Sequence, residues 1–202
     1  MKVFVFAHPV IDDFNGLGIE TCDKVIACDG ALFHLDKQNI KIHMSIGDFD
    51  SLEDKTLLEK YPHVTLNREK DETDSMVAIK YAYTLSDEVY LVGGIGGERF
   101  EHSIANINLL NLFQRLTIVT DKSKMFVLNE GEHILSFDGY ISIFPYNSAI
   151  ITLKGFKYPL NLYELNEFDS VGISNEIIAE RGKINITKGR VLVILTKSRS
   201  NM

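Results

Sequence analysis

Short apolar runs alternate with helix-like segments in the first part of the chain. The runs that predict strands are Val3–Ala7, Lys24–Cys28, a short run that ends at Gly47, Val64–Leu66, Glu88–Val92 and Leu116–Thr120. Three segments between these runs predict helices: Leu52–Lys60, Thr73–Leu85 and Ser103–Phe113. Strands that alternate with helices are typical of a mainly parallel sheet covered on both faces.

The pattern changes near Asn129, beyond which short β-prone runs are separated by turn residues. These runs are His133–Phe137, Tyr140–Pro145, Ala149–Leu153, Ile177–Glu180, Lys183–Ile186 and Arg190–Thr196. Such spacing predicts a small all-β sandwich or barrel. We therefore expect an α/β fold with a Rossmann-like, mainly parallel catalytic domain at residues 1–129 and an all-β domain at residues 130–202. A β domain of about 70 residues has little core of its own, so we expect it to pack on the first domain or on a second subunit.

Composition and charge narrow the function classes. The 202 residues are 45% hydrophobic and 24% charged, as in an ordinary soluble globular protein. A net charge of -7 argues against a nucleic-acid partner, because phosphate backbones require clustered Lys and Arg. The N-terminal apolar run is too short for a signal peptide, and no stretch approaches the ~20 residues that span a bilayer, so we expect a cytoplasmic protein without a membrane partner. Cys22 and Cys28 lack zinc-ligand spacing and are expected to be reduced and buried.

Candidate chemistry follows the predicted strands, where open α/β sheets bind their ligands. In Gly47-Asp48-Phe49-Asp50-Ser51, two carboxylates two residues apart can converge on a hard cation such as Mg²⁺. The alternative is a turn in which Asp50 and Ser51 cap the next helix.

Two further stretches offer charge for a cation or a phosphate. In Lys70-Asp71-Glu72-Thr73-Asp74, one interpretation is that Thr73 or Asp71 caps the next helix. However, three carboxylates within four residues repel one another and imply a metal or a basic neighbour. The Gly-rich stretch 93–102 lies between a predicted strand and a predicted helix. Its glycines permit close backbone approach to a phosphate, and Arg99 offers a planar fork for phosphate oxygens, although a tight turn would also explain the glycines.

The remaining candidates carry weaker signals. Asp29, in Asp29-Gly30 after the second strand, is a candidate binding residue that turn chemistry also explains. His102 is either a phosphate donor or a helix-start residue, and the other histidines show no ligand spacing.

In this order, the motifs resemble the thiamine pyrophosphokinase family. The matching stretches are CDGA (28–31), GDFDS (47–51), KDETD (70–74), GGERFEHSIAN (96–106), GFKYPL (155–160) and GISN (172–175), and they span nearly the whole chain. The resemblance implies an α/β catalytic domain, a β-sandwich and a homodimer that binds thiamine where domains and subunits meet.

The resemblance also implies roles for particular residues. Asp48, Asp50 and Asp71 would hold Mg²⁺, and Asp74 would belong to the same acidic group around the ATP polyphosphate. Further binding candidates are the loop residues Gly96, Gly97, Arg99 and His102 on the phosphate side, and Ser174 and Asn175 on the thiamine side. The family loop usually reads Gly-Gly-Arg-x-Asp-His, whereas here Glu98 precedes Arg99 and Glu101 replaces the Asp.

The reaction that the resemblance implies is transfer of diphosphate from ATP to the hydroxyl of thiamine, with release of AMP. Such transfer requires alignment and neutralisation of charge more than covalent chemistry from the protein. Arg99 would take part of the phosphate charge, and either Asp71 or Asp74 would orient or deprotonate the hydroxyl. Two alternatives are a phosphotransferase acting on another small alcohol and a non-catalytic sensor of thiamine or nucleotide.

Overall fold

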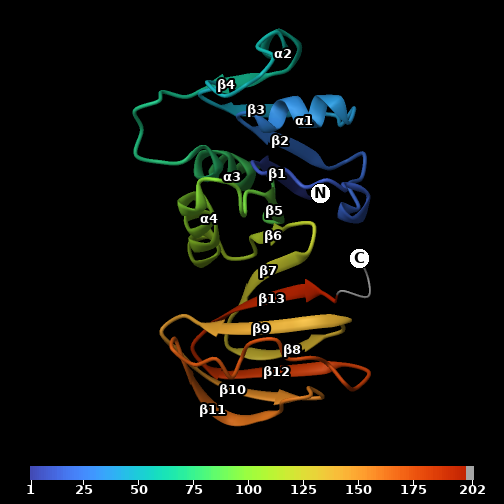
Figure 1. Ribbon diagram of the computed structural model, residues 1–202, viewed down its shortest axis with the longest axis vertical. Helices are drawn as coiled ribbons and strands as arrows, with labels where there is room; N and C mark the ends of the chain where they lie inside the picture. The colour runs from blue at the N-terminus through green and yellow to red at the C-terminus, as the bar shows by residue number, and fades with distance from the viewer. Residues whose placement is uncertain (199–202) are drawn as a thin grey trace. The chain divides into compact units, whose positions relative to one another are not determined.

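The computed structural model describes residues 1–198, which form two compact units (Figure 1). Unit 1 spans Met1–Asp121, and unit 2 begins at Lys122. The sequence pattern had suggested a boundary after Asn129. The division falls earlier because strand β7 (Ser123–Leu128) pairs antiparallel with β13 (Val191–Lys197), which belongs to unit 2.

Unit 1 is built on parallel strands, which confirms the predicted α/β class. The strands are β1 (Val3–Ala7), β2 (Lys24–Cys28), β3 (Met44–Gly47), β4 (His63–Thr65), β5 (Val89–Gly93) and β6 (Thr117–Val119). Their order is β4-β3-β2-β1-β5-β6, and each neighbouring pair is parallel. The carboxyl ends of these strands therefore lie along one edge of the sheet.

Helices cover both faces of this sheet. They are η1 (Asn15–Leu17, a 3-10 helix), α1 (Ala31–Lys37), α2 (Leu57–Lys60), α3 (Asp74–Leu85) and α4 (Phe100–Leu112). On one face, Phe4 and Phe6 of β1 share a buried cluster with Leu32 and Leu35 of α1. Successive strand residues point to opposite faces. The other face lies against α3, where Cys28 Sγ is 4.0 Å from the backbone oxygen of Asp74.

Helix α1 was not predicted, and the predicted helix Leu52–Lys60 forms only its last turn as α2. The reason is local: the Asp54 carboxylate accepts hydrogen bonds from Thr56 N at 2.9 Å and from Thr56 Oγ1 at 2.6 Å. An Asp side chain that bonds the backbone two residues on stabilises a turn in competition with the helix.

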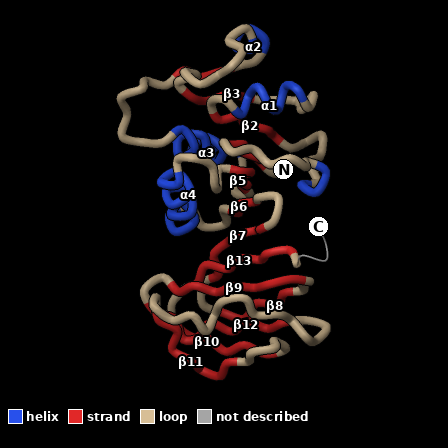
Figure 2. Tube along the Cα trace, viewed as in Figure 1, coloured by secondary structure: helices blue, strands red, loops and turns tan. Residues whose placement is uncertain are grey.

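Unit 2 consists of antiparallel strands, and Figure 2 shows no helix among its described residues, 122–198. Besides β7 and β13 they are β8 (Gly131–Leu135), β9 (Gly139–Pro145), β10 (Ser148–Lys154), β11 (Leu160–Asn166) and β12 (Gly182–Lys188). Strands β7-β13-β9 run side by side, and a second sheet has the order β11-β10-β12-β8.

One buried apolar cluster joins both groups of strands in unit 2. Ile141 and Ile143 of β9 pack in it with Ile151 of β10 and Ile184 of β12. Strand β11 was not predicted. The predicted strand Ile177–Glu180 was wrong, since it forms only an isolated bridge between Ile177 and Phe156.

The burial of the cysteines and the absence of a membrane span were also predicted from the sequence. Cys28 is buried as expected, but the prediction for Cys22 was wrong, because it is exposed beside Glu20 and Asp23. Among the described residues, none of the helices has the length and apolar character required to cross a bilayer.

Candidate active site

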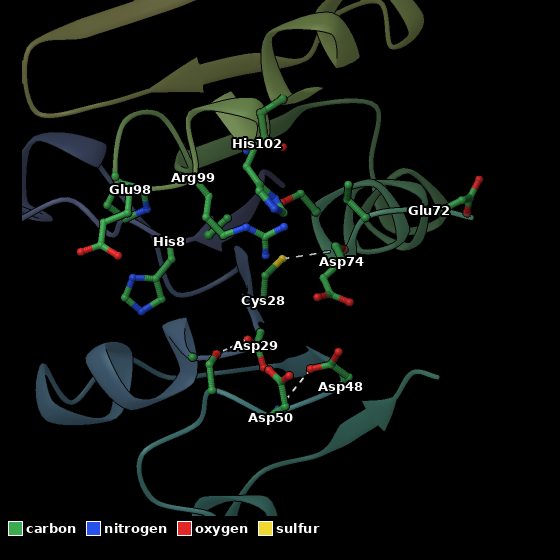
Figure 3. A pocket seen from close by; sticks show the side chains of 18 of the residues that line it. His8, Cys28, Asp29, Asp48, Asp50, Glu72, Asp74, Glu98, Arg99 and His102 are labelled. Carbon is green, nitrogen blue, oxygen red and sulfur yellow. Dashed lines mark hydrogen bonds between the residues drawn. The ribbon is translucent and has the colours of Figure 1, made fainter. Parts of the chain in front are cut away.

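A pocket of about 910 Å³ lies in unit 1 at the carboxyl ends of the parallel strands. Figure 3 shows its side chains, which come from segments far apart in the sequence. Carboxylates dominate the lining: Asp29, Asp48, Asp50, Glu53, Asp71, Glu72, Asp74 and Glu98. The Lys and Arg residues among the lining are Arg68, Lys70 and Arg99. The pocket therefore has an acidic wall with a few cations set into it.

The turn after β3 directs two of these carboxylates into the pocket. Phe49 is 2% exposed, belongs to the unit 1 core and has a left-handed φ of 56°. A left-handed residue reverses the chain locally, and here it buries the aromatic ring while Asp48 and Asp50 on either side line the pocket. Asp48 Oδ1 accepts a hydrogen bond from Asp50 N at 3.1 Å, which fixes the turn.

Asp29 joins this pair from the end of β2. The structure requires glycine at position 47, because a Cβ there would lie 2.8 Å from Asp29 Cα. Ser51 Oγ donates a hydrogen bond to Asp29 Oδ2. The five residues from Gly47 to Ser51 thus permit the close approach of Asp29, supply two carboxylates, anchor the turn in the core and orient Asp29.

The donor set here fits a hard divalent cation. Within the described part of the chain, Asp29, Asp48 and Asp50 each offer a carboxylate oxygen, and these oxygens lie within 4.8 Å of one another. Asp29 Oδ1 is shielded from solvent and has no hydrogen-bond partner among residues 1–198. Carboxylate oxygens are the ligands that Mg²⁺ prefers, and a buried carboxylate oxygen without a donor is costly unless a cation satisfies it.

The predicted metal ligands are only partly gathered. Asp48 and Asp50 belong to this group, whereas Asp71 is outside it, although it lines the same pocket. Asp29 is the third carboxylate of the group. Its signal in the sequence was the Asp-Gly dipeptide after a strand, which turn chemistry also explained.

The environment keeps Asp48 ionised. The backbone N–H of Asp50 lowers the pKa of Asp48, partial burial opposes this shift, and the positive charges of Lys70 and Arg68 lower the pKa further. Arg68 also reaches Asp50, with Nη2 3.3 Å from Oδ2. Neither cation had been given a role from the sequence, although Lys70 lies within the KDETD stretch.

The segment after β4 leads into α3 and adds charge of both signs. Thr73 is the N-cap of α3, and its side chain accepts a hydrogen bond from Met76 N at 3.2 Å. Lys70 Nζ lies 2.9 Å from Asp74 Oδ1 in the first turn of the helix. The basic neighbour implied by the crowded carboxylates is therefore present, and Asp71 remains exposed at the pocket wall.

The Gly-rich loop after β5 is attached to helix α4 by two buried polar side chains. Ser103 Oγ accepts from Gly96 N at 2.8 Å, and Asn106 Nδ2 donates to Gly94 O at 2.7 Å. Gly94 N is also engaged, with Ala7 O and Pro9 O each 3.0 Å away. The N–H groups of Gly94 and Gly96 thus bond within the protein. The sequence had pointed to the Gly96 backbone as a phosphate contact and had assigned no role to Ser103 or Asn106.

Arg99 lies between this loop and α4, immediately before the first helical residue. Figure 3 shows its guanidinium directed into the pocket, on the side opposite Asp29, Asp48 and Asp50. Arg99 Nε donates to Glu101 Oε1 at 3.0 Å, and its side chain is 74% exposed. His102 Nε2 lies 4.0 Å from the same Glu101 oxygen. Gly97 and Glu98 complete the loop at the pocket wall.

A pair of histidines forms another part of the lining that the sequence pattern did not reveal. The rings of His8, just after β1, and His34, on α1, have centroids 4.7 Å apart. Burial and the neighbouring His34 lower the pKa of His8. Their positions 26 residues apart gave no periodic signal, because the contact depends on the sheet order.

The two candidates on the thiamine side lie in unit 2 and differ in character. Asn175 is 1% exposed, and its Oδ1 accepts from Tyr158 N at 3.0 Å and from Glu176 N at 2.9 Å. Its Nδ2 donates to Tyr158 O at 2.8 Å, so this amide bonds to the fold itself. Ser174 is exposed, has a left-handed φ of 55° and donates its backbone N–H to Ser142 Oγ at 3.0 Å.

Comparison with known proteins gives a consistent result for both units. A family model described as "Thiamin pyrophosphokinase, catalytic domain" matches residues 17–120, and one described as "Thiamin pyrophosphokinase, vitamin B1 binding domain" matches residues 127–191. A thiamine pyrophosphokinase of Bacillus subtilis is 34% identical over 201 residues, with 92% of each chain covered.

Solved structures agree with this match. The crystal structure of the thiamine pyrophosphokinase from Bacillus subtilis has a TM-score of 0.86 at 26% identity and covers 98% of this chain and 100% of that one. The thiamin pyrophosphokinase from Geobacillus thermodenitrificans shares the fold, with a TM-score of 0.87 at 24% identity and 100% of both chains covered. Because the family models match both units and the relative matches along most of the chain, this protein belongs to the thiamine pyrophosphokinase family.

Proposed function

We propose that this protein transfers the diphosphate of ATP to the hydroxyl of thiamine, giving thiamine diphosphate and AMP. The observation that carries the proposal is the grouping of Asp29, Asp48 and Asp50 in one pocket, opposite Arg99, in a chain of this family. A cation site and a separate guanidinium in one pocket are the parts that a polyphosphate requires.

In the proposed reaction the thiamine hydroxyl oxygen forms a bond to the β-phosphorus of ATP. The bond from that phosphorus to the oxygen bridging to the α-phosphate breaks, and AMP leaves with the electron pair. The hydroxyl proton passes to a carboxylate, for which Asp71 and Asp74 are the candidates. Asp71 is the more accessible of the two, since Asp74 is paired with Lys70.

Arg99 would stabilise the negative charge that spreads over the phosphate oxygens in the transition state. Arg99 is directed into the pocket, and its fork geometry matches two phosphate oxygens. Binding ATP would draw Arg99 away from the exposed Glu101 carboxylate, at small cost because an exposed ion pair is worth little.

Asp29, Asp48 and Asp50 would hold Mg²⁺, with Asp71 as a further ligand reached through water or substrate. When bound, Mg²⁺ neutralises phosphate oxygens and stabilises the leaving group. Asp48 contributes an ionised carboxylate at neutral pH, because the backbone N–H of Asp50 lowers its pKa. The field of these carboxylates also attracts the cationic thiazolium ring of thiamine.

The proposal assigns separate tasks to the two units. Unit 1 would be a Rossmann-like domain for ATP and Mg²⁺, and unit 2 a β-sandwich that contributes to thiamine binding through the exposed Ser174. Two copies would form a homodimer. Consumption of ATP fits the cytoplasmic location expected from the sequence.

An assay with ATP, Mg²⁺ and thiamine tests the proposal. We expect AMP and thiamine diphosphate in equal amounts, with AMP formation that requires thiamine. ADP in place of AMP would indicate transfer of a single phosphoryl group. Binding of thiamine or ATP without turnover would indicate a sensor and would refute the proposed activity.

A further inference from the structure

Two buried polar residues of α4 point at the Gly-rich loop and bond to its backbone. Ser103 is 1% exposed and Asn106 is 3% exposed. Asn106 donates to Gly94 O at 2.7 Å, while Ser103 Oγ accepts from Gly96 N at 2.8 Å and lies 3.3 Å from Gly96 O. These bonds connect the first two turns of the helix to the loop that precedes it.

The first residue of the loop is also held from the end of β1, because Gly94 N bonds to Ala7 O and Pro9 O. The residues that follow depend more on the two side chains of α4. Gly94 and Gly96 both have left-handed φ angles, of 70° and 95°, and glycine is the residue with the largest conformational freedom. The contact with Asn106 is close, since a Cβ on Gly94 would lie 2.7 Å from Asn106 Nδ2. Without the two side-chain bonds, we expect residues 95–98 to sample several conformations.

We propose that Ser103 and Asn106 are positioning residues that hold the loop in place and thereby fix Arg99 in the pocket. Arg99 follows this loop and immediately precedes α4, so its backbone moves with both. Within the described residues, its guanidinium bonds to the exposed carboxylate of Glu101, which constrains it weakly. The orientation of its guanidinium therefore depends on the backbone that these two residues secure.

This inference rests on the proposed function, in which Arg99 contacts the phosphates. A buried polar pair that served stability alone would show as a lower free energy of unfolding. A positioning pair shows instead as a loss of kcat at nearly unchanged KM, because a misplaced Arg99 no longer stabilises the transition state.

The test compares matched variants of the full chain. Asn106→Asp keeps the shape but, when ionised, loses the donor to Gly94 O. Ser103→Ala removes the hydroxyl, and Ser103→Thr retains one. Asn108→Ala is the control, because Asn108 lies on the same helix and is exposed. We expect Asn106→Asp and Ser103→Ala to lower kcat roughly 10- to 100-fold, Ser103→Thr to recover most of the loss, and the control to match wild type.

A double-mutant cycle with Arg99→Ala shows whether the effect passes through Arg99. In the Arg99→Ala background, Asn106→Asp should cost no further activity, because interacting residues are not additive. Losses that multiply would overturn the proposal, as would wild-type kcat in both single variants.

Hydrogen exchange of the backbone amides at 95–97 supplies a readout that does not depend on turnover. Faster exchange in Asn106→Asp and Ser103→Ala supports the proposed attachment, and unchanged exchange refutes it. If wild type fails to form AMP while exchange accelerates as expected, the proposed function is wrong but the attachment of the loop is right.

Discussion

Gly47 lies where the end of β3 approaches Asp29 most closely, and it allows a direct test at the scale of one residue. A methyl group in Gly47→Ala would meet backbone and side-chain atoms of Asp29 at 2.8–2.9 Å. Because the obstructing atoms include backbone, the strands must separate, at a cost of about 1–3 kcal/mol. We expect a lower midpoint in urea denaturation. We also expect weaker binding of Mg²⁺, so that half-maximal activity requires a higher Mg²⁺ concentration. Gly16→Ala, where nothing lies within 4 Å of the added Cβ, is the control.

Asp71 is exposed at the pocket wall, so a change of its side chain should leave the fold intact. We expect Asp71→Asn to retain the far-UV spectrum and unfolding midpoint of wild type while kcat falls by orders of magnitude. Asp87→Asn, at an exposed carboxylate outside the pocket lining, should remain fully active. Wild-type kcat in Asp71→Asn would remove Asp71 from the proposed mechanism.

The sequence allowed the identification of residues whose chemistry is concentrated in short stretches. Asp48 and Asp50 were recognisable because two carboxylates follow a strand and a glycine. Asn106 and His8 were not recognisable, because an isolated polar residue on a helix or after a strand has many interpretations. Their roles depend on distances between elements far apart in the chain, which no local pattern specifies.

At the scale of elements, Thr73 determines where α3 begins. Its hydroxyl accepts from Met76 N, and Thr73→Ala leaves that N–H without its partner. We expect the free energy of unfolding to fall by about 1 kcal/mol, as is typical of lost N-caps. Urea denaturation followed by circular dichroism measures this change.

Thr73→Ser provides the matched comparison for the cap, because it keeps the hydroxyl and should remain near wild type. Equal stability of Thr73→Ala and wild type would show that the bond to Met76 contributes nothing.

Strands with continuous apolar sequence were predicted most accurately. Val3–Ala7 and Lys24–Cys28 have the same bounds in the structure as in the prediction, since a strand buried on both faces requires an unbroken apolar run. Strand β11 was missed because polar residues interrupt it and Leu162 is exposed. Helix α1 has only seven residues, fewer than the periodicity needed to identify an amphipathic helix.

At the scale of the whole molecule, the partly buried imidazole of His8 couples stability to pH. Partial burial first, and then His34, lower its pKa in the folded state below the ordinary imidazole value of 6.5. As the pH falls below about 6.5, the unfolded chain binds a proton that the folded chain does not, so the free energy of unfolding decreases. The decrease continues until the pH reaches the folded-state pKa.

We expect His8→Gln to reduce this slope between pH 6.5 and the folded-state pKa, as measured by urea denaturation at a series of pH values. Part of the slope should remain, because burial and then Lys24 also lower the pKa of His43. An identical slope in His8→Gln and wild type would contradict the assignment to His8.

Unit 2 exposes large apolar side chains that favour the proposed homodimer. Phe168 is 91% exposed, Ile178 is 71% exposed and Leu162 is 62% exposed. Covering such side chains with a second copy would remove their apolar surface from water. Sedimentation velocity should give twice the mass of one chain, and Phe168→Ser should shift the population toward the single chain. A wild-type protein that sediments as a single chain at every concentration would refute the dimer.

The central position of β1 has a consequence for synthesis on the ribosome. Val3 emerges well before Val89 of β5, which is one of its two parallel neighbours. At 5–20 residues per second, the nascent chain exposes one edge of β1 for about 4 to 17 s before that partner is made. An unpaired apolar strand is prone to aggregate, so we expect this interval to make the emerging β1 segment a client for chaperones that bind near the exit tunnel.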